Sequence, residues 1–197
     1  MASQLSLLQR NADKHGDNPD FQKDMKLTVK NTVEKMNDLL SRINIVNEPS
    51  KTREFAVIDV KPVVMASVET FKTAGHNVAF KGQEDIYCAL SNHDDLETVL
   101  MHIIQNALDA SEDQKLVEIS LAQDKNYVMI KVADSGTGMD KDFIRNELFR
   151  PFRSLKEGGY GIGAYESRQL IQNMSGRMEV KSKPGAGTLV TIYLKKE

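Results

Sequence analysis

Residues 94–111 constrain the fold of this chain more than any other part of its sequence. Their apolar members recur three or four positions apart and form one broad helical face: Leu96, Val99, Leu100, Ile103, Ile104, Ala107 and Leu108. Asp94 or Asp95 can cap the start of this helix by accepting hydrogen bonds from its free backbone N–H groups. A helix with so broad an apolar face needs a second layer of structure to pack against.

Strand and helix patterns alternate on both sides of this helix. Strands are expected at residues 55–60, 77–81, 86–90, 117–121, 127–132, 178–181 and 188–194, and further helices at 62–72 and 162–174. Turn signals at residues 124–126 and 184–187 join the later strands as hairpins. The pattern predicts an α+β two-layer sandwich, with a mixed sheet and helices on one face.

The first 48 residues contain no strand pattern. Apolar residues alternate steps of four and three along one helix face, which we call the heptad seam: Met25, Val29, Thr32, Met36, Leu39, Ile43 and Val46. A turn signal at residues 15–19 precedes the seam, so an α-helical hairpin is expected. We expect two copies to pair as a four-helix bundle, which would make the protein a homodimer. The alternative is that the seam packs on the C-terminal part of the same chain.

The domain boundaries follow from where these patterns change. Pro49 and Ser50 interrupt the helical pattern, so residues 49–54 are expected to form a linker. Residues 1–48 then form the hairpin, and residues 55–197 form a second domain.

Composition excludes several classes of function. The formal net charge of −2 argues against a nucleic-acid partner, because such proteins carry a concentrated basic face. The single cysteine, Cys88, excludes an internal disulfide framework and a cysteine-based zinc cluster. No apolar run approaches the roughly 20 residues that span a bilayer. We therefore expect no membrane contact and a cytoplasmic location for this chain.

Three polar residues of the helix at 94–111 are candidates for a functional role. His102 and Asn106 are four positions apart and share a face, and Asp109 lies three further on. The amide oxygen of Asn106 is a hard donor suited to Mg²⁺, an ion that keeps several waters and bridges phosphates. The alternative is that Asn106 hydrogen-bonds to nearby backbone, because a buried amide without a partner costs about 1–3 kcal/mol.

Asp134, Gly136 and Gly138 directly follow an expected strand. A carboxylate at a strand end can accept a hydrogen bond from an exocyclic amine, and glycines let the backbone approach a flat ring closely. The alternative is an ordinary turn between a strand and a helix. The dinucleotide-binding fingerprint is excluded, because the glycine spacing differs and no acidic residue follows at the required distance.

Two more segments follow along the chain. In residues 148–156, Phe149 and Phe152 flank a proline and two basic residues come next. We expect a mobile loop whose aromatics anchor one end and whose cations reach a phosphate; the alternative is a hydrophobic anchor with solvated charges. Glycines at residues 158–163 precede a helix, and the free N–H groups there suit a phosphate.

These four segments, in this order and at these intervals, resemble the nucleotide-binding boxes of the GHKL ATPases, which include gyrase, Hsp90, MutL and the sensor histidine kinases. Residues 185–188 resemble a further glycine element usual in the kinases, and the whole resemblance spans residues 55–194. The kinase branch fits best, because the hairpin resembles the dimerisation and phosphotransfer hairpin of those enzymes. Residues 148–163 are similar to the nitrogen-sensor-like subgroup, and the hairpin resembles that of sensor kinases linked to PEP-CTERM protein sorting.

The resemblance implies a role for each matching residue. Asn106 would be the Mg²⁺ ligand, and Asp134 would accept from the adenine amine. His102, Asn106 and Lys156 would form the catalytic set, with Lys156 on the segment that covers the phosphates. The other implied ATP contacts are Asp109, Gly136, Gly138, Gly159, Tyr160, Gly161, Ile162, Gly163 and Thr188.

The implied function is phosphoryl transfer from Mg²⁺-ATP to a histidine, and from there to an aspartate on the receiver domain of a response regulator. The family's phosphoacceptor histidine lies on the first helix of the hairpin and is followed by an acidic residue. It has no counterpart here, because the one histidine of residues 1–48, His15, precedes Gly16 at the expected turn. We therefore expect a truncated piece of a longer protein, unable to phosphorylate itself, whose parent is anchored to the inner membrane.

Three alternatives stay open. One is a GHKL ATPase of another branch, similar to gyrase or MutL, for which a glutamate is usual at the position of His102. Another is a non-enzymatic dimeric adaptor with a vestigial nucleotide pocket. A third is a serine kinase of the anti-sigma-factor type, against which the long hairpin argues.

Overall fold

The computed structural model describes residues 18–47, 54–82, 85–111, 115–153 and 161–196. The chain divides into two compact units, Met1–Pro49 and Ser50–Glu197. The division falls at the residues where the helical pattern of the N-terminal sequence ends.

The first unit contains one long helix, α2 (Pro19–Asn47). Its start is capped by Asn18, whose Oδ1 accepts hydrogen bonds from the backbone N–H groups of Asp20 at 2.9 Å and Phe21 at 3.4 Å. Pro19 occupies the first helical position, where its missing N–H costs no hydrogen bond. The other arm of the predicted hairpin lies outside the described residues. Among the residues described, no helix is both long and apolar enough to cross a membrane.

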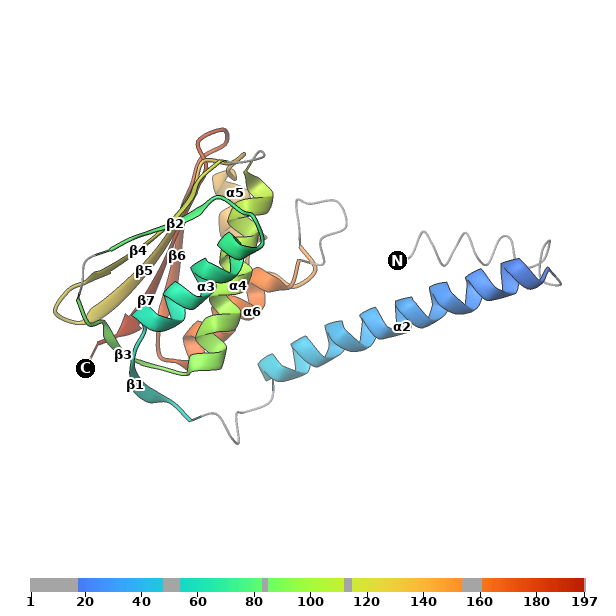
Figure 1. Ribbon diagram of the computed structural model, residues 1–197, viewed down its shortest axis with the longest axis horizontal. Coiled ribbons are helices and arrows are strands. Elements are labelled where there is room, and N and C mark those ends of the chain that lie inside the picture. Colours follow the sequence, from blue (N-terminus) through green and yellow to red (C-terminus); the bar gives the residue numbers. More distant parts are fainter. Residues whose placement is uncertain (1–17, 48–53, 83–84, 112–114, 154–160, 197) are drawn as a thin grey trace. The chain divides into compact units, whose positions relative to one another are not determined.

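The second unit is built on a five-stranded sheet in the order β2–β4–β5–β7–β6 (Figure 1). The strands are β2 (Val78–Lys81), β4 (Val117–Gln123), β5 (Tyr127–Asp134), β6 (Arg177–Ser182) and β7 (Thr188–Lys195). β2 runs parallel to β4, whereas the other neighbouring pairs are antiparallel, so the sheet is mixed. Strands β1 (Ala56–Asp59) and β3 (Cys88–Ser91) form a separate antiparallel pair.

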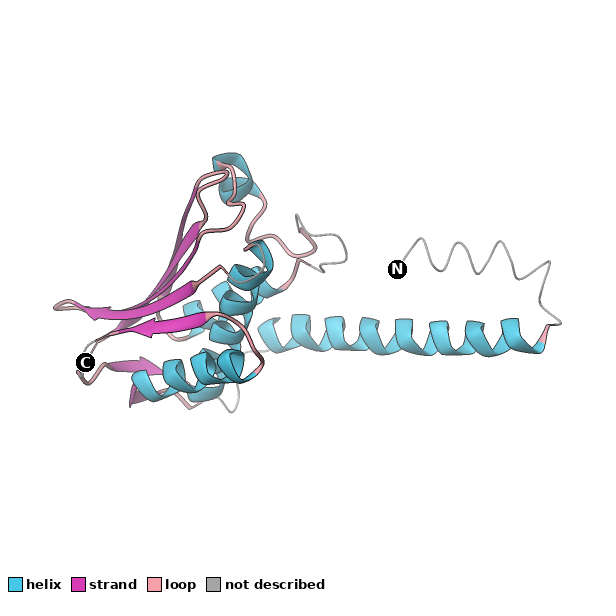
Figure 2. Ribbon diagram, turned by 45° about the horizontal axis from the view of Figure 1, so that its top comes forward, coloured by secondary structure: helices cyan, strands magenta, loops and turns pink. Residues whose placement is uncertain are grey.

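Three helices cover one face of this sheet (Figures 1 and 2): α3 (Lys61–Thr73), α4 (His93–Ala110) and α6 (Gly163–Asn173). Alternate strand residues point into that layer, since Val117, Ile119 and Leu121 of β4 are buried and their neighbours are less so. Among the described residues of this unit, no helix lies on the opposite face. The predicted two-layer sandwich with helices on one face is therefore confirmed.

Helix α4 is the central member of the helical layer. Its Leu96, Leu100 and Ile104 are fully buried in one hydrophobic cluster with residues of the sheet and of α6. Burying side chains of this size contributes roughly 1.5–3 kcal/mol each. The packing fixes how α4 is rotated, and it thereby fixes where the polar residues of α4 emerge.

Each helix and strand predicted in the second unit is present, with bounds within two residues of those expected. The predicted cap of α4 is wrong. Asn92 caps the helix instead, since its Oδ1 accepts from the backbone N–H of Asp95 at 3.0 Å. The helix begins at His93, one residue earlier than expected, so Asp94 and Asp95 lie in its first turn, where carboxylates also favour the helix dipole.

One helix was not predicted, α5 (Lys141–Asn146). It is six residues long and has no buried residue, so it carries no apolar periodicity. Its start is capped by Asp140, whose Oδ1 accepts from the backbone N–H of Phe143 at 2.7 Å.

The face of the sheet opposite the helices carries a group that we call the sheet-face cluster: Tyr127, Arg177, Glu179 and Tyr193. The Arg177 guanidinium lies 3.6 Å from the centroid of the Tyr193 ring, and the Tyr193 hydroxyl donates to Glu179 Oε2 at 2.9 Å. That hydrogen bond, together with the ion pair to Arg177, lowers the pKa of Glu179. The cluster covers part of the sheet that no described helix of this unit covers.

Candidate functional site

Two segments of the second unit contact helix α4. At the C-terminal end of α4, a methyl group built on Gly136 would lie 2.2 Å from the carbonyl oxygen of Ala110, so the loop after β5 is in backbone contact with the helix. Two turns earlier, a methyl group on Gly163 would lie 3.7 Å from Cγ of His102. Helix α4 therefore contacts both the loop after β5 and the N-terminus of α6.

Asp134 ends β5 with its carboxylate held by the backbone. Its Oδ1 accepts from the N–H groups of Gly136 at 2.8 Å and Thr188 at 3.2 Å. Thr188 is also the residue that faces Asp134 across the β5–β7 ladder. Hydrogen bonds to a charged acceptor are stronger than neutral ones, so they fix the orientation of this carboxylate.

The loop after β5 is tied to the turn between β6 and β7. Thr137 donates its N–H to Ala110 at 3.0 Å and accepts at its carbonyl from Gly185 at 2.7 Å. Gly138 and Gly187 adopt positive φ angles of 66° and 81°, and a methyl group on either would lie 2.1 Å from a backbone oxygen. We call this part of the site the Asp134 end: Asp134, Gly136, Gly138, Gly187 and Thr188.

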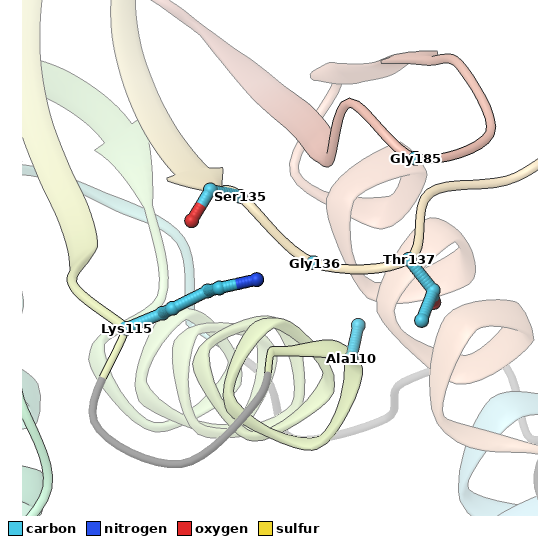
Figure 3. Close-up of a pocket in the computed structure, with 6 residues that line it drawn as sticks. All are labelled: Ala110, Lys115, Ser135, Gly136, Thr137 and Gly185. Carbon is cyan, nitrogen blue, oxygen red and sulfur yellow. The ribbon is translucent and has the colours of Figure 1, made fainter.

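A hollow of about 270 Å³ opens beside the Asp134 end (Figure 3). Its lining comes from Ala110, Lys115, Ser135, Gly136, Thr137 and Gly185. The side chain of Lys115 extends into it, and this residue was not predicted because it lies between two elements and belongs to no pattern. Of the predicted site residues that the structure describes, Gly136 alone lines the hollow, so the hollow adjoins the predicted set without coinciding with it.

We call the other part of the site the His102 end: His102, Asn106, Gly161, Gly163 and Glu166. The His102 side chain is 24% exposed, and its Nδ1 lies 3.8 Å from Oε2 of Glu166 on α6. Glu166 is only 4% exposed, and it was not among the predicted site residues. A signal was available, since Glu166 lies four positions before Leu170 on the face of α6 that carries its apolar residues.

Asn106 and Asp109 are both exposed on α4. The expectation that Asn106 is buried on an apolar helix is therefore wrong, because the apolar face of α4 ends beside it. Asp109 Oδ1 accepts from Gln105 Nε2 at 2.6 Å, one turn earlier. In the described part of the chain, no group of three or more histidine, cysteine or carboxylate side chains is placed to hold a metal ion.

The segment before α6 agrees only in part with its prediction. Phe149 is anchored, with the Arg168 guanidinium 4.7 Å from its ring centroid. Phe152 is 61% exposed and has a φ of 65°, so the prediction that both aromatics anchor this segment is wrong. Arg153 makes a 2.8 Å ion pair with Glu147.

The backbones of residues 153 and 161 are in contact. A methyl group on Gly161, where φ is 65°, would lie 2.3 Å from the carbonyl oxygen of Arg153. Ile162 is 2% exposed, so a ligand could meet only its backbone. Lys156, Gly159 and Tyr160 lie outside the described residues, and their roles stay predictions.

Residues 91–197, more than half of the chain, match the family described as histidine kinase-, DNA gyrase B-, and HSP90-like ATPase. The chain belongs to this ATPase family. The match begins just before α4 and contains every described residue of the Asp134 and His102 ends.

Two relatives of this ATPase domain are named as sensor proteins. The C4-dicarboxylate transport sensor protein DctB of Rhizobium meliloti is 37% identical over 110 residues, which cover 55% of this chain and 17% of DctB. The sensor histidine kinase YvrG of Bacillus subtilis is 24% identical over 190 residues, or 91% of this chain and 33% of YvrG. The chain thus spans a third or less of the length of these two relatives.

Solved structures share the fold. The histidine kinase AdeS of Acinetobacter baumannii matches with a TM-score of 0.69 and 18% identity, covering 98% of this chain and 95% of the AdeS chain in that structure. The mycobacterial sensor histidine kinase MprB matches with a TM-score of 0.64 and 20% identity, covering 72% of this chain and 97% of the MprB chain. At these identities the likeness concerns the fold.

Proposed function

We propose that this chain is the ATP- and Mg²⁺-binding catalytic region of a two-component sensor histidine kinase. The observation that carries the proposal is the contact of one helix, α4, with both the loop after β5 at Gly136 and the N-terminus of α6 at Gly163. This arrangement brings a fixed carboxylate, an exposed amide and a helix N-terminus to one edge of the domain. The similarity to YvrG over 91% of the chain supports the kinase branch of the family.

The Asp134 end would recognise adenine. Oδ1 of Asp134 accepts from two backbone N–H groups, so the orientation of the carboxylate is set before a ligand arrives. The carboxylate would accept from the exocyclic amine of the base. The glycines at 136 and 138 would let the ring lie close to the backbone.

The His102 end would bind the metal and the phosphates. Asn106 is exposed on α4 and offers one amide oxygen, a ligand that Mg²⁺ accepts when waters and phosphate oxygens complete its shell. The free N–H groups at the start of α6, beginning near Gly161 and Gly163, suit the phosphates. Bound Mg²⁺ would neutralise charge on the transferring phosphoryl group.

The chain's own part in the reaction would be positioning. Phosphoryl transfer needs little covalent help from the protein, so holding the γ-phosphate in line with an acceptor supplies most of the rate enhancement. We propose that the acceptor is a histidine on a phosphotransfer hairpin, and that a receiver-domain aspartate takes the group next.

We also propose that α2 contributes to a homodimer. Val29 of the heptad seam is 43% exposed, and Val33, one turn further along α2 and beside the seam, is 49% exposed. Exposed apolar side chains four positions apart form a stripe that a second helix can cover.

The test is calorimetry with Mg²⁺-ATP, followed by a steady-state phosphate-release assay on the same protein. We expect one nucleotide bound per chain and no steady turnover, as for a kinase that waits for its acceptor. Steady hydrolysis that is abolished in His102→Ala would overturn the kinase assignment in favour of a gyrase- or MutL-like ATPase. Absence of binding would instead support an adaptor with a vestigial pocket.

A further inference from the structure

The His102 end contains a buried residue, Glu166, to which the proposed function gives no role. Glu166 Oε2 lies 3.8 Å from His102 Nδ1, and the two residues come from different helices, α6 and α4. We infer that Glu166 is a positioning residue, which holds the His102 ring with Nδ1 toward α6 and so presents Nε2 to the bound nucleotide. The inference rests on the proposed function, because it assigns a partner to a residue of that same site.

The burial of Glu166 supports this assignment. The residue is 4% exposed, and a buried carboxylate is costly unless a charged or hydrogen-bonding partner compensates for lost water. His102 supplies such a partner from the facing helix. An apolar residue at position 166 would pack in the same interface without this cost, so a plain packing role does not account for a glutamate.

The distance is consistent with a contact that shortens on binding. At 3.8 Å the two atoms are within ion-pair reach but beyond a hydrogen bond. Hydrogen bonds of catalytic groups are commonly long without ligand and tighten in the complex. A movement of about 1 Å by either flexible side chain would complete this one.

The position of the His102 ring determines what the pair can recognise. His102 lies one helical turn before Asn106, and its ring packs against Gly163, where the phosphates are proposed to bind. A carboxylate that accepts a hydrogen bond from Nδ1–H fixes this tautomer of the neutral ring. Nε2 then carries the lone pair. That nitrogen would accept a hydrogen bond from a water on the metal, so the group His102 recognises is a metal-bound water.

The first test reads the tautomer in the wild-type chain. Long-range ¹H–¹⁵N spectra at a pH of about 8.5, where an ordinary histidine is neutral, report which ring nitrogen carries the proton. The His102 signal is assigned by its loss in His102→Gln, and His76 and His93 serve as internal references. We expect the Nδ1–H tautomer for His102; an Nε2–H tautomer would overturn the inference.

The second test is a double-mutant cycle, with Mg²⁺-ATP affinity measured by calorimetry on the wild type, Glu166→Leu, His102→Ala and the double variant. Leucine removes the acceptor that a glutamine would keep. We expect Glu166→Leu to weaken binding roughly tenfold, and to have no further effect once His102 is alanine. Additive losses would overturn the inference, because Glu166 would then act without His102. Glu179→Leu, on the opposite face of the sheet, is the matched control and should bind like the wild type.

The two proposals fail in different ways. If the wild type binds no Mg²⁺-ATP, the proposed function fails, whereas wild-type binding with an additive cycle removes only the role of Glu166. Thermal unfolding of each variant checks the fold. Should Glu166→Leu not fold, the tautomer of the wild type still decides the question.

Discussion

The two ends of the site are held in place by different kinds of interaction. At the Asp134 end, backbone N–H groups and carbonyls bond directly, from Gly136 and Thr188 to Asp134 and from Thr137 to Ala110. At the His102 end, Gly161 makes a backbone contact with Arg153, but the described contacts between α4 and α6 join side chains, as between His102 and Glu166, or a ring and a glycine. Backbone bonds leave little freedom, whereas side chains can rotate.

The glycines show the same difference. At the Asp134 end, an added methyl group would come within 2.1–2.2 Å of a backbone oxygen at Gly136, Gly138 and Gly187. At the His102 end, a methyl group on Gly161 would also come within 2.3 Å of a backbone oxygen, but one on Gly163 would make an ordinary contact of 3.7 Å with the His102 ring. We conclude that the Asp134 end is preformed for a rigid base, and that part of the His102 end can adjust to phosphates that change during a reaction.

The largest effect is expected from Gly187→Ala. A methyl group there would collide with the Asp134 carbonyl oxygen in a residue whose φ is 81°. We expect a loss of at least about 3 kcal/mol of stability, seen as a fall in Tm of roughly 10 °C by circular dichroism.

Gly185→Ala is the matched control for that variant. It has a similar φ of 74°, but nothing lies within 4 Å of an added methyl group. Its cost should be limited to about 1–2 kcal/mol of backbone strain. Equal losses in the two variants would show that the Asp134 end is less tightly packed than its contacts indicate.

The next largest effect concerns nucleotide binding by Asp134→Asn. The amide oxygen can still accept from Gly136 and Thr188, but the charge is gone and an NH₂ group can face the adenine amine. We expect ATP affinity to fall about 100-fold in calorimetry, with Tm little changed. Retained affinity would remove adenine recognition from this end.

Asn106→Ala should weaken nucleotide binding only when metal is present. Because Asn106 is exposed, its loss should not disturb the fold. We expect Mg²⁺-ATP affinity to fall roughly tenfold, while ATP binding in EDTA stays as in the wild type. Gln105→Ala, a change at the neighbouring exposed residue, should do neither, and an equal effect in both variants would argue against a ligand role.

A smaller effect is expected from Gly163→Ala. The methyl group fits beside His102, and alanine favours the helix over glycine. We expect an unchanged or slightly raised Tm and a loss of roughly threefold in Mg²⁺-ATP affinity. A collapse of the fold like that of Gly187→Ala would remove the contrast between the two ends.

The smallest effect belongs to the sheet-face cluster, which serves as a reference outside both ends. The Tyr193 hydroxyl lowers the pKa of Glu179, so this pair contributes stability above the ordinary carboxyl value of 4.5 and loses it as pH falls further. Tyr193→Phe should therefore lower Tm slightly at pH 7 and not at all at a pH of about 2. ATP affinity should not change, and a change would extend the site beyond the two ends.

The sequence predicts most of the fold because its signals are local. The periodicity of apolar residues in α4 and their alternation in β4 follow from which residues must be buried. The glycines at 136 and 138 predict a turn whatever the tertiary structure around them. The signal was too weak for α5, which buries no residue. The exposure of Asn106 was misjudged because periodicity alone does not locate the edge of an apolar face.

The pairing of Glu166 with His102 could not be predicted, although the burial of Glu166 on α6 could have been. Glu166 lies 64 positions along the chain from His102, and only the packing of α6 on α4 brings the two within 3.8 Å. Lys115 likewise lines its hollow together with residues from other parts of the chain. Such pairs depend on tertiary structure and leave no spacing that a sequence pattern can detect.

The central claim is that the two ends form one nucleotide site, and backbone amide NMR tests it most directly. Titration of the wild-type chain with Mg²⁺-ATP should shift the amide signals of Gly136 and Gly138 together with those of Gly161 and Gly163, at one common affinity. The signals of Arg177 and Tyr193 should stay in place. Shifts confined to one end, or two ends that saturate at different nucleotide concentrations, would contradict the account.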